Sequence, residues 1–124
     1  MTRMRRLTQS DRDCWATCVA MLARVDRGAL PALSVWARKN AVAFDDFRSR
    51  LAHKLLRLGW TIATTPSPPQ GWAIAVGEGH RGIRHAVVVR NGVLWHDPHP
   101  DHAGLKAVDH YEIVIRRATE TPRG

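Results

Sequence analysis

The chain lacks several features that mark common classes of protein. Its 124 residues include only two cysteines, show no internal repeat, and nowhere approach the roughly 18–20 consecutive apolar residues of a membrane-spanning helix. The charged residues 1–6 are followed by no apolar run, so we expect neither a signal peptide nor a membrane anchor. The expected location is therefore the cytoplasm, a reducing compartment in which both cysteines would be free thiols.

Lysine and acidic residues are scarce as well, so the net charge of the chain is positive and comes mainly from arginine. Three lysines and sixteen arginines face 11 acidic residues, which gives a formal net charge of +8. A basic balance is compatible with nucleic acid or with acidic partner proteins. Because the arginines are spread along the chain, the charge alone favours no particular partner.

What the chain does contain is enough apolar material for a folded domain. Hydrophobic residues make up 44% of the sequence and five tryptophans are present, which favours a globule over a disordered chain. A length of 124 residues fits one domain with a single core. We expect residues 1–124 to form that domain, with residues 1–8 as an N-terminal arm and residues 118–124 as a flexible tail.

Apolar spacing predicts helices in the first half of the chain. The first helix should run to about residue 25, with Asp11 or Asp13 as its N-cap, and should end at residues 26–28. Its apolar side chains recur every three or four residues, as one core-facing stripe: Trp15, Cys18, Val19, Leu22 and Val25. A short helical segment is expected over residues 30–38.

A second long helix is expected after a cap at Asp45 or Asp46, and Gly59 is expected to close it. Its predicted stripe is Phe47, Leu51, Leu55 and Leu58.

The second half of the chain changes to the period of strands. We expect strands over 60–64, 72–76, 84–90, 93–96 and 111–115, with loops over 65–71, 77–82 and 97–109. Asn91-Gly92 is the residue pair preferred in a two-residue type I′ hairpin turn. Helices followed by strands predict an α+β fold in which N-terminal helices pack on a C-terminal antiparallel sheet.

Cys14 and Gln9 form the first half of a candidate catalytic site. Cys14 lies at the predicted start of the first helix, where the positive end of the macrodipole favours thiolate over thiol. Gln9 lies just upstream and can offer its side-chain amide as a hydrogen-bond donor. A nucleophilic sulfur beside a donor suits covalent acyl transfer. Cys18, by its spacing, belongs to the core.

The predicted hairpin supplies the second half of the site. If Arg90 pairs with Val93, His85 faces position 98, and Asp97 lies one step away, about 5–7 Å from His85 at the backbone. A carboxylate can then hold one ring nitrogen while the other faces a thiol, which is the arrangement of a base and its orienting group.

These features, in this order, resemble the papain-like cysteine peptidases. The chain is most similar to the compact bacterial branch that trims double-glycine leaders from bacteriocin precursors, and to its stand-alone relatives. The matching residues are Gln9, Asp13-Cys14, Met21-Leu22, His85 with the apolar residues 86–89, and Asp97-Pro98. Trp15 departs from the glycine usual in the bacterial branch, but Cys14-Trp15-Ala16 is found in papain itself.

The resemblance implies a role for each of four residues. Cys14 would be the nucleophile, His85 the general base, Asp97 the residue that orients the base, and Gln9 the oxyanion donor. It implies a peptide or protein substrate and no cofactor. The same groups serve deamidation, transglutamination and other acyl transfers equally well.

Other interpretations of the same residues stay open. Cys14 can be an ordinary buried residue, His85 a hydrogen-bonded strand residue, Asp97 the start of a turn, and Gln9 a solvent-facing side chain. The alternative function is a catalytically idle domain that binds nucleic acid or an acidic protein through its basic surface.

A metal site is a further alternative. Several potential ligands lie close together, although their spacing matches no standard pattern: His96, Asp97, His99, Asp101 and His102.

Overall fold

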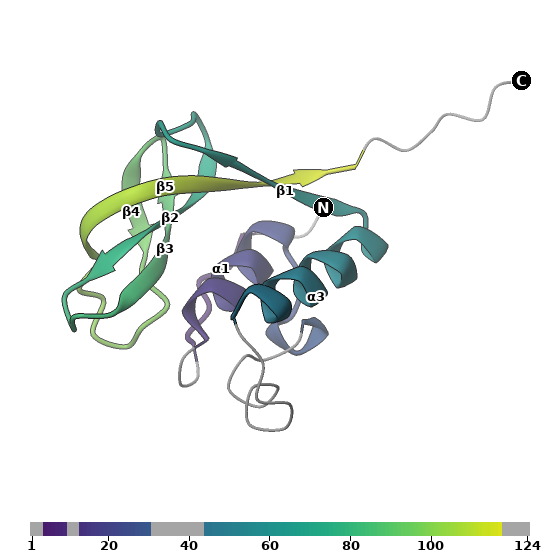
Figure 1. Ribbon diagram of the computed structural model, residues 1–124, viewed down its shortest axis with the longest axis horizontal. Helices are drawn as coiled ribbons and strands as arrows, with labels where there is room; N and C mark the ends of the chain where they lie inside the picture. Colours follow the sequence, from purple (N-terminus) through teal and green to yellow (C-terminus); the bar gives the residue numbers. More distant parts are fainter. Residues whose placement is uncertain (1–3, 10–12, 31–43, 118–124) are drawn as a thin grey trace, which may run out of the picture.

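A computed structural model describes residues 4–9, 13–30 and 44–117 of the chain. In this part of the chain the order is helices first and strands afterwards, and the fold is α+β as predicted. Figure 1 shows helices α1 and α3 on one side of a strongly twisted sheet. The short helix expected over 30–38, apart from Leu30, and the expected tail over 118–124 lie outside the described residues.

The first helix, α1 (Cys14–Ala23), is shorter than predicted and buried on nearly every side. It ends because Arg24 takes the left-handed conformation, with φ of 55°. Asp13 does occupy the N-cap position, but its side chain makes no capping hydrogen bond. Its carboxylate instead binds Arg27, which lies in the short 3-10 helix η1 (Arg27–Ala29). Asp11, the other proposed cap, lies outside the described residues.

The second long helix, α3 (Phe44–Arg57), begins earlier than predicted. Asp45 and Asp46 are therefore inside the helix, and the prediction that one of them caps it is wrong. Three of the four predicted stripe residues are fully buried: Phe47, Leu51 and Leu55. The fourth, Leu58, lies beyond the helix end and is 40% exposed. Gly59 follows with φ of +92°, a conformation that glycine adopts without strain.

Five strands form one antiparallel sheet in the order β1-β5-β2-β3-β4. Their bounds are β1 Trp60–Thr65, β2 Trp72–Gly79, β3 Arg84–Arg90, β4 Val93–His96 and β5 Leu105–Arg116. Three strands exceed their predictions: β1 includes Thr65, β2 continues into the expected loop 77–82, and β5 takes up the end of the expected loop 97–109. The long β5 pairs with both β1 and β2, which connects the two halves of the sheet (Figure 1).

The β3–β4 hairpin has the predicted turn but a different register at its far end. Asn91 and Gly92 have φ of 51° and 78°, as a type I′ turn requires. Arg90 pairs with Val93 as expected, but the register shifts by one residue between Val89 and Val88. The expected pairing of His85 with position 98 is therefore wrong.

The main core lies between the helices and the sheet. Residues of α1 and α3 pack there against Ile74, Ala86 and Val88 of the central strands. On the other face of the sheet, every second residue of β2 and β3 contributes to a smaller apolar cluster: Ala73, Ala75, Val87 and Val89. Helix α1 is thus enclosed by α3, η1 and the sheet, which fixes the position of its first residue, Cys14.

Candidate active site

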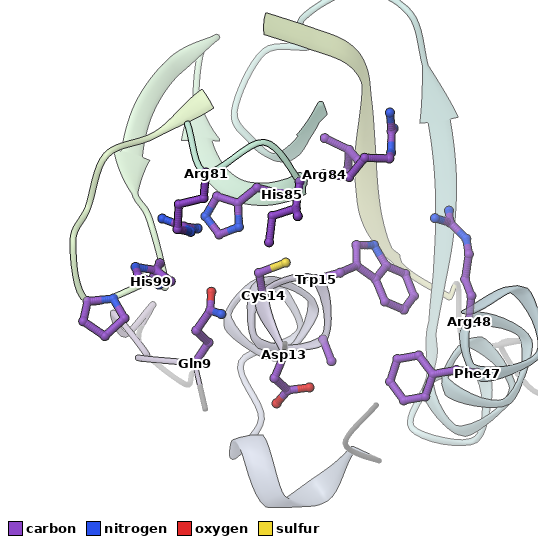
Figure 2. A pocket seen from close by; sticks show the side chains of 14 residues that line it. Gln9, Asp13, Cys14, Trp15, Phe47, Arg48, Arg81, Arg84, His85 and His99 are labelled. Atoms are coloured by element: carbon purple, nitrogen blue, oxygen red, sulfur yellow. The ribbon is translucent and has the colours of Figure 1, made fainter. Parts of the chain in front are cut away.

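A cavity of about 810 Å³ lies at the N-terminal end of α1. Its lining comes from the N-terminal segment, helices α1 and α3, strands β2 and β3 with the turn between them, and the loop after β4. Figure 2 shows Cys14 in the middle of this lining, with Gln9 and His85 to either side. Three of the four residues proposed from the sequence therefore share one cavity, and the fourth, Asp97, lies directly behind His85.

Cys14 is half-buried at the first position of α1. Burial raises the pKa of its thiol, although hydrogen bonding from the backbone N–H groups of Ala86 and Trp15 acts in the opposite direction. The charge of Asp13 raises the pKa further. This direction is opposite to the one expected from the helix end alone, because the cost of burying a thiolate exceeds the favourable contributions.

His85 and Asp97 form a buried pair, each with at most 3% of its surface exposed. The Nε2 atom of His85 lies 2.6 Å from Oδ1 of Asp97. Because an ionised carboxylate can only accept, Nε2 carries the proton and the lone pair of the neutral ring is on Nδ1. The pair forms despite the shifted register, since the loop after β4 brings Asp97 beside His85, near the start of β3.

The carboxylate of Asp97 has three hydrogen-bond donors. In addition to His85, the backbone N–H of His99 donates to Oδ1 at 2.9 Å and that of Gly104 donates to Oδ2 at 2.8 Å. Burial opposes its ionisation, but these hydrogen bonds prevail and lower the pKa of Asp97 below its ordinary value. Asp97 is therefore more than a turn residue: it is an ionised group that holds His85 in one tautomer.

Gln9 is placed by the same loop that carries Asp97. Its backbone N–H donates to the carbonyl of Pro98 at 2.9 Å. Two residues earlier, Leu7 accepts a hydrogen bond from Nε2 of His96 at 2.8 Å, and its N–H lies 3.3 Å from Sδ of Met21. Residues 7–9, at the end of the expected N-terminal arm, thus lie against α1 and the loop after β4, and Gln9 reaches the cavity from there.

Cys14 and His85 line the same cavity, but they do not form a hydrogen bond with each other. Among the described residues, the hydrogen bond to Asp97 is the only one that the His85 ring makes. Hydrogen bonds between a nucleophile and its base are often loose without substrate and tighten when substrate binds. The arrangement can therefore supply a nucleophile, an oriented base and an amide donor around one space.

Three residues near the site were missed by sequence reasoning. Gly79 closes the turn before His85, since its N–H donates to the Ile83 carbonyl at 2.8 Å and its α-carbon lies against the His85 side chain. Glu112 is fully buried beside Trp15, whose Nε1 donates to Oε1 at 2.8 Å. Arg48 also reaches the Glu112 carboxylate, at 2.8 Å. A polar residue within the apolar strand 111–115 was the one available signal for Glu112.

The histidines considered as metal ligands have other partners. His96 binds the Leu7 carbonyl, and Nδ1 of His102 lies 3.0 Å from the Asp97 carbonyl, where it donates. His99 lines the cavity and meets the edge of the His85 ring. Within residues 4–9, 13–30 and 44–117, no group of three histidine, cysteine or acidic side chains is arranged to hold a metal ion.

Cys18 is completely buried one turn after Cys14, and burial raises the pKa of its thiol well above the ordinary value. Both cysteines are free thiols. In the described part of the chain, no helix is long and apolar enough to cross a membrane.

Comparison with protein-family models, curated proteins and solved structures found no significant match.

Proposed function

We propose that the protein is a thiol-dependent amide hydrolase of the papain-like kind, most simply a cysteine peptidase. The observation that carries the proposal is the shared cavity of Cys14, His85 and Gln9, with Asp97 2.6 Å from the far side of the imidazole. Resemblance to the papain-like sequence order supports the same four residues. The antiparallel sheet packed against α1 is compatible with a papain-like fold.

In the proposed reaction, Sγ of Cys14 attacks the carbonyl carbon of a bound amide while its proton passes to Nδ1 of His85. The negative oxygen that forms is held by the Gln9 side-chain amide and by the backbone N–H of Cys14. The imidazolium then gives its proton to the leaving amine, and a thioester remains on Cys14. Water, deprotonated by His85, hydrolyses the thioester and releases the acid.

The electrostatics favour a resting state with a neutral thiol. Burial raises the pKa of Cys14, so a preformed thiolate is disfavoured at neutral pH. The ionised Asp97 compensates at the moment of proton transfer, because it stabilises the imidazolium that forms. General-base assistance by His85 is therefore central to the proposal.

Alkylation of the thiols tests the proposal without knowledge of the substrate. At pH 7, iodoacetamide should label Cys14 much faster than the fully buried Cys18, as followed by peptide mass spectrometry. The His85→Ala variant should slow labelling of Cys14 roughly 100-fold, the lower end of what general-base assistance contributes. The variant should react appreciably only at alkaline pH, because burial raises the pKa of the Cys14 thiol.

A second measurement connects the reactive thiol to amide cleavage. Fluorescently labelled casein should be cleaved by the wild type and left intact by Cys14→Ala, with Cys18→Ala as the matched control that retains the cleavage. Equal, slow labelling of both cysteines, unaffected by the loss of His85, would show that the proposed function is wrong.

A further inference from the structure

Two arginines stand at the mouth of the cavity beside the proposed base. Arg81 lies in the turn between β2 and β3, Arg84 is the first residue of β3, and both line the cavity with His85. Figure 2 shows them on the same side of Cys14 as His85. The segment that carries the proposed base therefore also places two arginines in the lining of the cavity.

The cavity offers these charges almost no competing anion. Among the described residues of its lining, Asp13 is the sole carboxylate. Two nitrogens of Arg27 bind its two oxygens, so this carboxylate already has a cationic partner. A third lining arginine, Arg48, is held by the buried Glu112 and is not available in the same way.

The present partners of Arg81 and Arg84 lie outside the cavity and are easily exchanged. Arg81 pairs with Asp101, and Arg84 pairs with Asp109. The two aspartate side chains are 42% and 52% exposed, and ion pairs between exposed groups contribute little net stability. A carboxylate arriving in the cavity can therefore replace them at small cost.

We propose that Arg81 and Arg84 form an anion-binding rim, and that the substrate is an acidic peptide with a carboxylate side chain close to the bond attacked. This inference rests on the proposed function, because it assigns the substrate class of the same site. A planar guanidinium forms two parallel hydrogen bonds to a carboxylate, which makes a pair of arginines selective for this group.

Two alkylating reagents that differ only in charge test the rim. Iodoacetate carries a carboxylate where iodoacetamide carries a neutral amide. In both reactions Sγ of Cys14 bonds to the methylene carbon, iodide leaves with the bonding electron pair, and the thiol proton goes to His85 or to solvent. The ratio of the two rates cancels the reactivity of the thiol itself and reports the charge around it.

We expect this ratio to exceed that of 2-mercaptoethanol, a neutral free thiol. Each arginine should contribute about threefold, from the attraction of unit charges some 7 Å apart in water. The Arg81→Gln/Arg84→Gln double variant should lose the excess, and 0.5 M salt should reduce it. Arg57→Gln removes an exposed charge outside the cavity lining and should leave the ratio unchanged.

A second variant is expected to raise the ratio, and a rise cannot result from unfolding of the protein. Asp101→Asn/Asp109→Asn releases both arginines and should raise the ratio above that of wild type. Two peptides that differ only in one residue test the substrate class directly. The wild type should cleave the peptide with glutamate faster than the one with glutamine, and the double arginine variant should cleave both at the same rate.

The outcomes separate the two proposals. If Cys14 reacts rapidly with iodoacetamide but its ratio equals that of 2-mercaptoethanol, the anion-binding rim is wrong and the reactive thiol stands. If Cys14 reacts with neither reagent faster than Cys18, the proposed function itself fails.

Discussion

At the scale of single residues, Asp97 orients His85, the proposed base. The Asp97 carboxylate accepts hydrogen bonds from His85, His99 and Gly104, so it is the acceptor for all three of these donors. Because both oxygens act as acceptors, the proton of the neutral imidazole is held on Nε2 and the lone pair on Nδ1. The chemistry of His85 is thus decided by a side chain that does not itself face the cavity.

The Asp97→Asn variant tests this dependence on the tautomer. An amide has one acceptor oxygen, so its NH₂ group must face either His85 or Gly104 as a second donor. If it faces His85, Nε2 must accept and the ring proton moves to Nδ1. We expect alkylation of Cys14 at pH 7 to fall nearly as far as in His85→Ala. We also expect the free energy of unfolding to fall by about 1–3 kcal/mol, the cost of an unsatisfied buried group.

The measurements are the iodoacetamide rate and a urea denaturation curve. A variant that loses stability but alkylates Cys14 at the wild-type rate would show that Asp97 has only a structural role.

At the scale of elements, the β2–β3 connection positions His85, the proposed base. Strands β2 and β3 approach each other closely at Gly79. A Cβ added at this position would lie 2.9 Å from the Ile83 carbonyl oxygen and 3.0 Å from Cβ of His85. The first contact is with backbone, which cannot move aside as a flexible side chain can. The geometry of this short connection thus couples the end of β2 to the orientation of His85.

Gly79→Ala should therefore displace His85 and slow the alkylation of Cys14. Crowding of this kind costs about 1–3 kcal/mol of stability. The matched control is Gly28→Ala, since nothing lies within 4 Å of a Cβ at that position. Its free energy of unfolding should stay within about 0.5 kcal/mol of wild type.

Equal alkylation rates in wild type, Gly79→Ala and Gly28→Ala, measured under identical conditions, would exclude a positioning role for Gly79.

At the scale of the whole molecule, Glu112 joins three elements. From β5, its buried carboxylate binds Trp15 of α1 and Arg48 of α3, and it accepts a hydrogen bond from His110 at 2.9 Å. Burial opposes its ionisation, but the hydrogen bonds from Arg48, His110 and Trp15 lower the pKa of Glu112 below its ordinary value. Trp15 directly follows Cys14, so this cluster also holds the start of α1.

The lowered pKa predicts a dependence of stability on pH. Because the folded state binds the proton of Glu112 less readily than the unfolded chain, its contribution is complete above the unfolded pKa of about 4.3. That contribution is lost as the pH falls through the lower folded value. We expect the free energy of unfolding to decrease between pH 6 and pH 3, and to decrease less in Glu112→Gln. At pH 6 this variant should be less stable by about 1–3 kcal/mol.

Urea denaturation at the two pH values measures both effects. Asp26→Asn removes the carboxylate of an exposed pair with Arg5 and should leave the pH dependence close to that of wild type. An unchanged pH dependence in Glu112→Gln would contradict the assignment.

The sequence by itself determined the elements whose signals are local. The period of the apolar residues placed α1, the stripe of α3 through Leu55 and the central strands, because large apolar side chains that pack into a core recur with the period of the element that carries them. Asn91-Gly92 determined its turn, since few other residue pairs accept two positive φ angles.

Only the tertiary structure decided how these elements meet. Asp13 lost its expected cap interaction to Arg27, a residue 14 positions away, and the hairpin register shifted at Val88. Burial reversed the expected direction of the Cys14 pKa, because desolvation depends on everything packed around the thiol. The sequence could nominate Gln9, Cys14, His85 and Asp97. The enclosure of α1 and the loop after β4 brought Gln9, Cys14 and His85 to one cavity, with Asp97 behind the imidazole.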